Sequence, residues 1–304
     1  MVRSAADVEE PEVGAPSPLA RSADVVLDWF AVEGRDLPWR HCRDPWAILV
    51  SELMLQQTQV ERVIDRWPRF LRRFPDPSTC ARAPRADVIE EWAGLGYNRR
   101  AVNLHRAAEV IADDHGGRVP TELGDLLDLP GIGPYTARAI RVFAYEADDA
   151  VLDTNVARIL ARAGGVTLSR AEAQAAADAA VPAGRGWAWN QALLDVGATC
   201  CRSRRPDCGR CPVVAACSWH TEGRPEPDPA VGSAGVSGGQ SRFEGSDRQG
   251  RGRLVDALRA APVAMADLAV VMGWPDDAAR AHRVADGVVA DGLARRQGDT
   301  LTLG

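Results

Sequence analysis

A glycine-rich turn and a carboxylate lie close together in the sequence. The turn is in Leu129-Pro-Gly-Ile-Gly-Pro-Tyr-Thr-Ala137, and Asp153 follows it. Gly131 and Gly133 lack Cβ atoms, so the turn can adopt otherwise strained dihedrals and bring backbone N–H groups close to an anion. A helix expected over residues 136–145 would add the positive end of its dipole. The pattern predicts a phosphate-binding hairpin beside a reactive carboxylate, although Asp153 could also serve only as a helix N-cap.

A second carboxylate belongs to an apolar segment. Glu52 is the only charged residue between Trp46 and Leu55, and this segment is expected to be a helix. Burial of a carboxyl group disfavours its charged form, which keeps a proton available near neutral pH. Glu52 is therefore a candidate acid. The alternative is a glutamate whose stem is buried while its head reaches solvent.

Four of the seven cysteines form a compact cluster in the sequence. Disulfides are a weak explanation, because nothing suggests secretion. Zinc remains an alternative, although structural zinc more often uses two Cys-x-x-Cys pairs and only one is present. Four closely set thiolates also fit a [4Fe–4S] cluster. The candidate ligands, separated by six, two and five residues, are Cys201, Cys208, Cys211 and Cys217.

Composition limits the kind of partner. The chain has 304 residues, which suggests about two domains, and its 46% hydrophobic content is ample for a core. Its net charge of −6 is not typical of a protein that coats DNA non-specifically, so any nucleic-acid surface must be local. Residues 202–210 supply one candidate surface, with Arg202, Arg204, Arg205 and Arg210 against Asp207.

The elements that position these residues are expected to be helices. Residues 22–200 show helical patterns broken by prolines and no useful stretch of period two, which predicts an all-α body. Residues 220–240 are rich in Pro, Gly and Ser and are expected to form a flexible linker. In residues 241–304 we expect helices around Leu254–Leu258 and Val284–Leu293, then a hairpin around Gly298. This indicates a small helical module that resembles a winged helix.

The N-terminal residues 1–21 are expected to be a disordered tail, because they mix Pro, Ala and acidic side chains without the apolar region of a signal peptide. No apolar run is long enough to span a membrane. We therefore expect a cytoplasmic, nucleoid-associated protein without a membrane partner.

Three of these features resemble one family. The hairpin segment resembles the helix-hairpin-helix element of the DNA glycosylase superfamily that contains endonuclease III. Ser51-Glu-Leu-Met-Leu-Gln-Gln-Thr-Gln-Val60 closely resembles the corresponding stretch of adenine DNA glycosylases of the MutY family, and the cysteine spacing matches their iron–sulfur loop. The resemblance covers about residues 24–219. It implies a helix-hairpin-helix glycosylase fold in residues 22–219, with two helical lobes and a [4Fe–4S] loop over residues 200–217.

The resemblance also implies the reaction. The enzyme would be a monomer that excises adenine opposite 8-oxoguanine or guanine in double-stranded DNA and so initiates base excision repair. Glu52 would protonate the adenine and help to activate water, while Asp153 would stabilise the cationic sugar with support from Tyr135 and Asn155. The target base must first leave the stack.

Other positions carry over as binding residues. The hairpin residues Gly131, Ile132 and Gly133 would bind DNA phosphate, and hairpin carbonyls would hold a monovalent cation. Gln57 and Tyr97 would wedge into the duplex, although Tyr97 could be an ordinary turn residue. The adenine pocket would contain Trp39, Arg40, Leu55 and Gln191; their alternatives are core packing for Trp39 and Leu55 and surface polarity for Arg40 and Gln191.

The chain contains no lysine, because all 36 basic residues are arginines. Related enzymes that also cut the strand use a lysine after the hairpin to form a Schiff base, and a guanidinium cannot be deprotonated to replace it. This excludes lysine-dependent lyase chemistry. Tyr135 instead matches the tyrosine found at this place in many adenine glycosylases.

The C-terminal residues weaken the resemblance. Adenine glycosylases usually carry a Nudix-like domain that helps to recognise 8-oxoguanine, and residues 241–304 do not look like that domain. Two other functions remain open: a related glycosylase acting on mispaired thymine or another pyrimidine, and a non-catalytic iron–sulfur DNA-binding protein.

Overall fold

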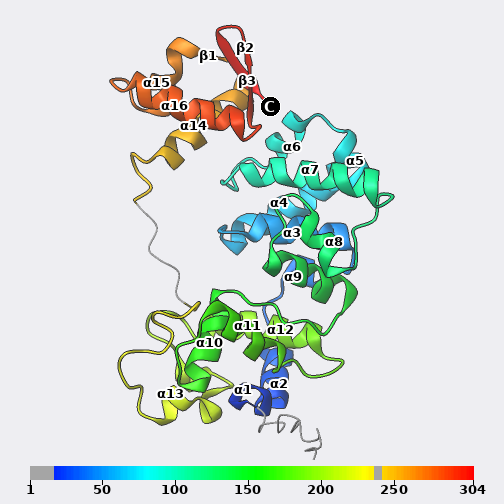
Figure 1. Ribbon diagram of the computed structural model, residues 1–304, viewed down its shortest axis with the longest axis vertical. Helices are drawn as coiled ribbons and strands as arrows, with labels where there is room; N and C mark the ends of the chain where they lie inside the picture. Colours follow the sequence, from blue (N-terminus) through cyan, green and yellow to red (C-terminus); the bar gives the residue numbers. More distant parts are fainter. Residues whose placement is uncertain (1–16, 236–241) are drawn as a thin grey trace, which may run out of the picture. The chain divides into compact units, whose positions relative to one another are not determined.

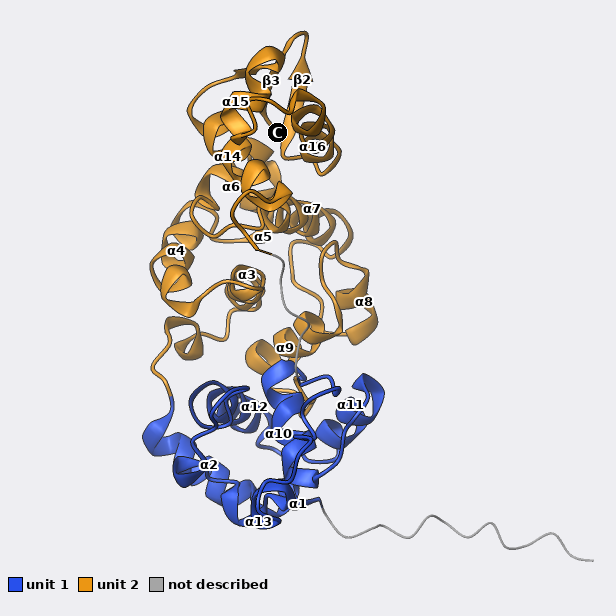
Figure 2. Ribbon diagram, turned by 90° about the vertical axis from the view of Figure 1, so that its left-hand side faces the viewer, with its two compact units in different colours: residues 1–34, 152–237 blue, residues 35–151, 238–304 orange. Residues whose placement is uncertain are grey.

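The computed structural model describes residues 17–235 and 242–304. The chain forms two compact units, shown in separate colours in Figure 2. Unit 1 is made of residues 1–34 and 152–237, and unit 2 is made of residues 35–151 and 238–304. Each unit therefore combines segments that lie far apart in the sequence, and the expected glycosylase region is divided between them.

The described part of unit 1 is helical (Figure 1). Its core forms around α10, which packs against α1, α11, α12 and α13, while α2 packs against α12. The elements are α1 (Pro18–Arg21), α2 (Ala23–Glu33), α10 (Thr154–Gly164), α11 (Arg170–Asp178), α12 (Gly186–Asp195), η2 (Val196–Cys200), η3 (Cys208–Arg210), η4 (Val214–Ala216) and α13 (Ser218–Thr221).

The first part of unit 2 is also helical. Its centre is α3, which packs against α4, α7 and α9 and has nine consecutive buried residues from Trp46 to Met54. The elements are η1 (Pro38–His41), α3 (Pro45–Leu55), α4 (Val60–Arg73), α5 (Pro77–Arg82), α6 (Arg85–Glu91), α7 (Arg99–Asp114), α8 (Leu123–Asp128) and α9 (Pro134–Tyr145).

The C-terminal part of unit 2 is a helical module with a small sheet. The strands are antiparallel in the order β1-β3-β2, and Gly298 turns the hairpin between β2 and β3 with a φ of +58°. The expected helices and hairpin are confirmed. The elements are α14 (Asp247–Ala260), β1 (Val263–Ala264), η5 (Met265–Asp267), α15 (Leu268–Met272), α16 (Ala278–Ala290), β2 (Ala294–Gln297) and β3 (Thr300–Leu303).

Arginines attach this module to the rest of unit 2. The Arg259 guanidinium donates to the Ile89 carbonyl at 3.0 and 3.3 Å and to Asn98 Oδ1 at 3.1 Å. Arg99 pairs with Asp291 across 3.5 Å. These contacts join α14 and the end of α16 to α6 and the start of α7.

Two expectations for the chain's irregular segments need correction. Residues 17–21 were expected to belong to the disordered tail, but they begin α1, in which Leu19 is buried and Ser17 caps the helix. A flexible linker was expected over residues 220–240, yet His220 and Thr221 belong to α13 and Ala230 and Ser233 are buried within unit 1. The polar composition of the segment was misleading, because one of its acidic side chains, Asp228, pairs with the buried Arg162. Residues 1–16 and 236–241 lie outside the described residues.

In the described parts of the chain, no helix combines the length and the apolar character needed to cross a membrane.

Candidate active site

The expected hairpin joins α8 to α9. Gly131 has a φ of +81°, and a Cβ atom there would come within 2.7 Å of the Asn103 Cβ atom. Gly133 is the N-cap of α9, has an ordinary φ of −104° and would not crowd any atom with a Cβ. Ile132 is buried and anchors the turn. Only Gly131 therefore needs to be glycine for the conformation of the turn.

Tyr135 lies in the first turn of α9, directly after the hairpin, and is partly exposed. The next residue, Thr136, is buried and accepts a hydrogen bond from Gln56 Nε2 at 3.3 Å. Gln56 is the C-cap of α3. This contact links the start of the hairpin helix to the end of the helix that carries Glu52.

Glu52 lies on α3, and its residue is only 5% exposed. Asp44 caps the helix by accepting from the Trp46 N–H, and the Trp46 indole donates to the Phe74 carbonyl at 2.9 Å. The Trp67 indole donates to the Ala47 carbonyl at 2.8 Å. These bonds fix the helix in the core. The burial expected for Glu52 is confirmed, and the alternative in which its head reaches solvent is wrong.

Asp153 is the N-cap of α10, in unit 1. Its Oδ1 atom accepts from the Val156 N–H and its Oδ2 atom from Asn155 Nδ2, both at 2.7 Å. Burial raises the pKa of the Asp153 carboxyl, while these donors favour its charged form and oppose the rise. The capping role is thus real, and it fixes the orientation of the carboxylate through both of its oxygens.

Arg158 connects this carboxylate to the cysteine loop. Its guanidinium donates to Asn155 Oδ1 at 2.7 Å, to the Cys201 carbonyl at 2.6 Å and to the Gly197 carbonyl at 2.9 Å. A Cβ atom on Gly197 would approach the Asn155 Cβ atom to 2.4 Å. Sequence reasoning missed both residues. Two arginines one turn apart, Arg158 and Arg162, among the otherwise apolar buried residues of α10 were the available signal.

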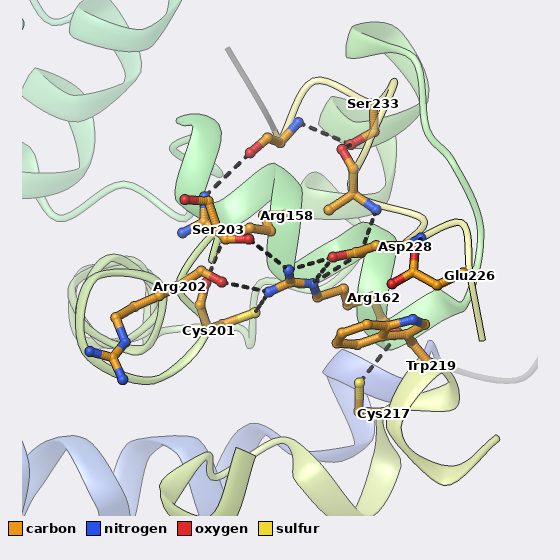
Figure 3. A network of polar contacts seen from close by, with 12 residues as sticks. Arg158, Arg162, Cys201, Arg202, Ser203, Cys217, Trp219, Glu226, Asp228 and Ser233 are labelled. Carbon is orange, nitrogen blue, oxygen red and sulfur yellow. Dashed lines mark hydrogen bonds and ion pairs between the residues drawn. The ribbon is translucent and has the colours of Figure 1, made fainter. Parts of the chain in front are cut away.

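Arg162, one turn further along α10, holds the segment that follows the cysteines (Figure 3). It forms an ion pair with Asp228, donates to the Arg202 carbonyl at 2.8 Å and lies 4.7 Å from the centre of the Trp219 ring. It also donates to the Cys201 sulfur at 3.4 Å. This ion pair anchors the chain at Asp228, next to the buried residues Ala230 and Ser233.

The four candidate cysteine ligands lie close enough for their charges to interact. Burial raises the pKa of Cys208, Cys211 and Cys217, to about 12 for Cys211, and the charge of Cys201 raises each further. The Cys200 sulfur instead contacts the Arg210 carbonyl at 3.5 Å. Within residues 17–235 and 242–304, no three Cys, His, Asp or Glu side chains have the geometry to hold a metal ion as they stand. The donor set, four thiols beside arginines, suits an anionic iron–sulfur cluster.

The candidate pocket residues are largely buried. Trp39 is 5% exposed and packs edge-on against Trp67, with ring centres 6.2 Å apart. Arg40 is 7% exposed and donates to the Arg35 carbonyl at 2.7 Å. Gln191 is buried in α12 of unit 1. Surface polarity therefore does not explain Arg40 or Gln191.

The two candidate wedge residues share an unusual backbone. Gln57 and Tyr97 have φ values of +55° and +46°, although the left-handed region disfavours side chains. Both are exposed, Tyr97 by 41%. Such strain persists only where the surroundings enforce it, and it is common at functional sites.

Arg100 enforces these two turns and was not identified from the sequence. It donates to the Leu53, Met54 and Gln56 carbonyls at 2.6–2.9 Å and to the Gly96 carbonyl at 2.9 Å. Burial lowers the pKa of Arg100 to about 10. One guanidinium thus ties the end of α3 to the turn before α7.

The candidate site residues divide between the units. Unit 1 contributes Asp153, Asn155, Gln191 and the four cysteines; unit 2 contributes Glu52, Tyr135, Trp39, Arg40, Leu55, Gln57, Tyr97, Gly131, Ile132 and Gly133.

Known proteins resemble the chain across these regions. Residues 50–182 match the model of the HhH-GPD superfamily of base excision DNA repair proteins. Adenine DNA glycosylases from two Mycobacterium tuberculosis strains are 44% identical over 303 residues, which cover 95% of both chains. The adenine DNA glycosylase of Mycolicibacterium smegmatis is 41% identical, with 90% of this chain and 92% of that one covered. A solved thermostable thymine-DNA glycosylase has a TM-score of 0.65 at 30% identity and covers 67% of this chain and 97% of that one. The expected helix-hairpin-helix fold is confirmed.

Proposed function

The chain belongs to the adenine DNA glycosylases of the HhH-GPD superfamily, and we propose how its residues divide the reaction. The family relationship makes it a monofunctional hydrolase that cleaves the N-glycosidic bond of adenine in DNA and initiates base excision repair. The observation that best supports our assignment is Glu52, an acidic side chain 5% exposed in the middle of an apolar helix. Burying an acidic group costs free energy. A role in the reaction would explain why the protein keeps one in this position.

We assign the acid role to Glu52. Adenine leaves readily only when its ring is protonated, so a carboxylic acid must meet the extruded base. Burial disfavours the charged form of a carboxyl group, which supports the choice of Glu52 as that proton donor. After the base departs, the resulting carboxylate can orient the attacking water. Trp39, Arg40, Leu55 and Gln191 are proposed to surround the adenine.

Asp153 is proposed to face the sugar. The cation that forms as the base leaves needs a fixed anion, and two hydrogen bonds hold this carboxylate in place before the reaction begins. Asn155 maintains that orientation. Tyr135 is proposed to support the sugar together with Asp153. It takes the position at which lyases carry a nucleophilic lysine, and the chain contains no lysine that could act in that way.

Double-stranded DNA is the partner, and we propose mispairs of adenine with 8-oxoguanine or guanine as its substrates. The hairpin and the N-terminus of α9 would bind a phosphate, because backbone N–H groups converge there. Gln57 and Tyr97 would fill the space left by the extruded base. We also propose that hairpin carbonyls hold a monovalent cation, as the family resemblance implies.

We propose that Cys201, Cys208, Cys211 and Cys217 hold a [4Fe–4S] cluster. The cluster would supply a fixed centre around which the loop folds. Arg162, which already donates to the Cys201 sulfur, would stabilise its negative charge. Metal analysis should find about four irons per chain, as a [4Fe–4S] cluster requires, and stoichiometric zinc in their place would contradict the assignment.

Single-turnover assays on duplexes with A:8-oxoG, A:G, T:G and A:T pairs test the function. Adenine release from A:8-oxoG and A:G, with strand breaks appearing only after alkali, is the expected result. Strand cutting without alkali would contradict the lysine argument. Faster release of thymine from T:G would instead support the pyrimidine alternative.

A further inference from the structure

The C-terminal module of residues 242–304 lies outside residues 50–182, the range that matches the superfamily model, although the mycobacterial relatives match over 95% of the chain. Within unit 2 it lines one side of a cleft of about 970 Å³. The other side carries both wedge residues. Gln57, Arg62 and Tyr97 thus face a space that Phe243, Arg248 and Arg251 also line.

A direct contact joins the module to a wedge residue. Arg248 Nη1 donates to the Tyr97 hydroxyl at 3.3 Å. The Arg248 guanidinium also lies 5.8 Å from the centre of the Phe243 ring. Both rings are exposed, Tyr97 by 41% and Phe243 by 58%. One cation therefore lies between two aromatic side chains that have surface available for stacking.

The charge of the cleft is opposite to that of the chain. Among the described residues, five arginines and one acidic residue, Asp291, line it, whereas the whole chain has a net charge of −6. Asp291 pairs with Arg99 and Arg251. A single carboxylate cannot offset five guanidinium groups, so the cleft favours a polyanion.

We propose that this cleft binds DNA next to the wedge residues and that the C-terminal module is a second DNA-binding element of the enzyme. Arg248 and Arg62 contact phosphate oxygens, and Phe243 stacks on a nearby base. The inference rests on the proposed function, because it takes Gln57 and Tyr97 to be the residues that enter the duplex. An acidic peptide would match the charge but would give no reason for wedge residues in the wall.

The test compares Arg248→Ala with Arg295→Ala in the full-length protein. Arg295 is exposed on β2 of the same module and does not line the cleft. Affinity for an A:8-oxoG duplex is measured by fluorescence anisotropy over a series of salt concentrations. Arg248→Ala should weaken binding about tenfold and reduce the salt slope by about 1. Phe243→Ala should weaken binding about tenfold without changing the slope. Arg295→Ala should change neither.

The proposal is overturned if Arg248→Ala leaves affinity and slope unchanged, or if Arg295→Ala weakens binding as much. Thermal unfolding of each variant shows whether a lost affinity comes from unfolding of the protein. Adenine release from the same duplex is measured in parallel for the wild-type chain. If adenine is released but Arg248→Ala does not affect binding, the cleft proposal is rejected and the proposed function is retained. An Arg248-dependent salt slope without adenine release rejects the proposed function and retains the cleft.

Discussion

Glu52 lies in the middle of a buried helix, whereas Asp153 lies just before the first turn of another. Apolar packing around α3 positions Glu52. Hydrogen bonds position Asp153, and they continue through Asn155 and Arg158 to the cysteine loop. One candidate carboxylate thus depends on the core of unit 2, and the other depends on a polar network in unit 1. The two should respond differently to substitution, to pH and to loss of the cysteine loop.

The largest effect is expected for Glu52→Gln. Glutamine keeps the size of the side chain but cannot donate a carboxyl proton, so excision should fall about 10²- to 10⁴-fold. Single-turnover adenine release measures this, and anisotropy should show nearly unchanged DNA affinity. If the variant excises adenine at the wild-type rate, Glu52 is not the acid.

Asp153→Asn should also slow excision, by at least about 100-fold, because it removes the anion facing the sugar. The stability of this variant, unlike its activity, should not fall. Asparagine caps helices as well as aspartate does. Because the pKa of Asp153 is raised in the folded state, its ionisation destabilises the fold as pH rises above about 3.8. The variant should therefore equal or exceed wild-type stability at pH 7.

Urea unfolding at several pH values checks this sign. The difference in free energy of unfolding should vanish below the unfolded-state pKa, where both side chains are neutral. A variant that is less stable than wild type at pH 7 and equally stable at low pH would show that the charged carboxylate is stabilising instead.

Arg158→Lys and Arg100→Lys form a matched pair across the two units. Lysine keeps the charge but cannot reproduce a forked set of hydrogen bonds, so each variant should lose about 2–3 kcal/mol of stability. Arg158→Lys should mainly slow excision, because Asn155 and Asp153 lose their support. Arg100→Lys should mainly weaken DNA binding, because the Gln57 and Tyr97 turns relax. Identical losses in both assays for both variants would break the comparison between the units.

The smallest effect concerns the hairpin glycines of unit 2. Gly131→Ala should destabilise the protein by more than about 1 kcal/mol, because its φ is positive and Asn103 occupies the space of a Cβ atom. Gly133→Ala should cost less than about 1 kcal/mol, since alanine is only a poorer N-cap. Denaturant midpoints compare the two. Equal losses would show that the tight approach to Asn103 is not the constraint.

Much of the site was predictable because its chemistry lies in short contiguous motifs. The hairpin turn and the burial of Glu52 were correctly predicted from local sequence, whereas the N-cap role of Asp153 was only the alternative to its functional reading. Arg100 and Arg158 were not. Arg158 donates to Gly197 and Cys201, and Arg100 donates to Leu53, Met54 and Gln56. These partners lie 39–47 residues away in the sequence, and no local pattern specifies such pairs.

The sequence by itself determined which groups are available: two carboxylates, four clustered thiols, a hairpin, and no lysine for a Schiff base. These follow from residue types and spacing within single turns or loops. Tertiary structure decided how the groups are held. It showed that Asp228 pairs with Arg162 and so anchors the chain after the cysteine loop, and that Arg248 reaches Tyr97 from 151 residues away. Only packing brings such partners together, because buried charges and hydrogen-bonding groups must find partners wherever the fold places them.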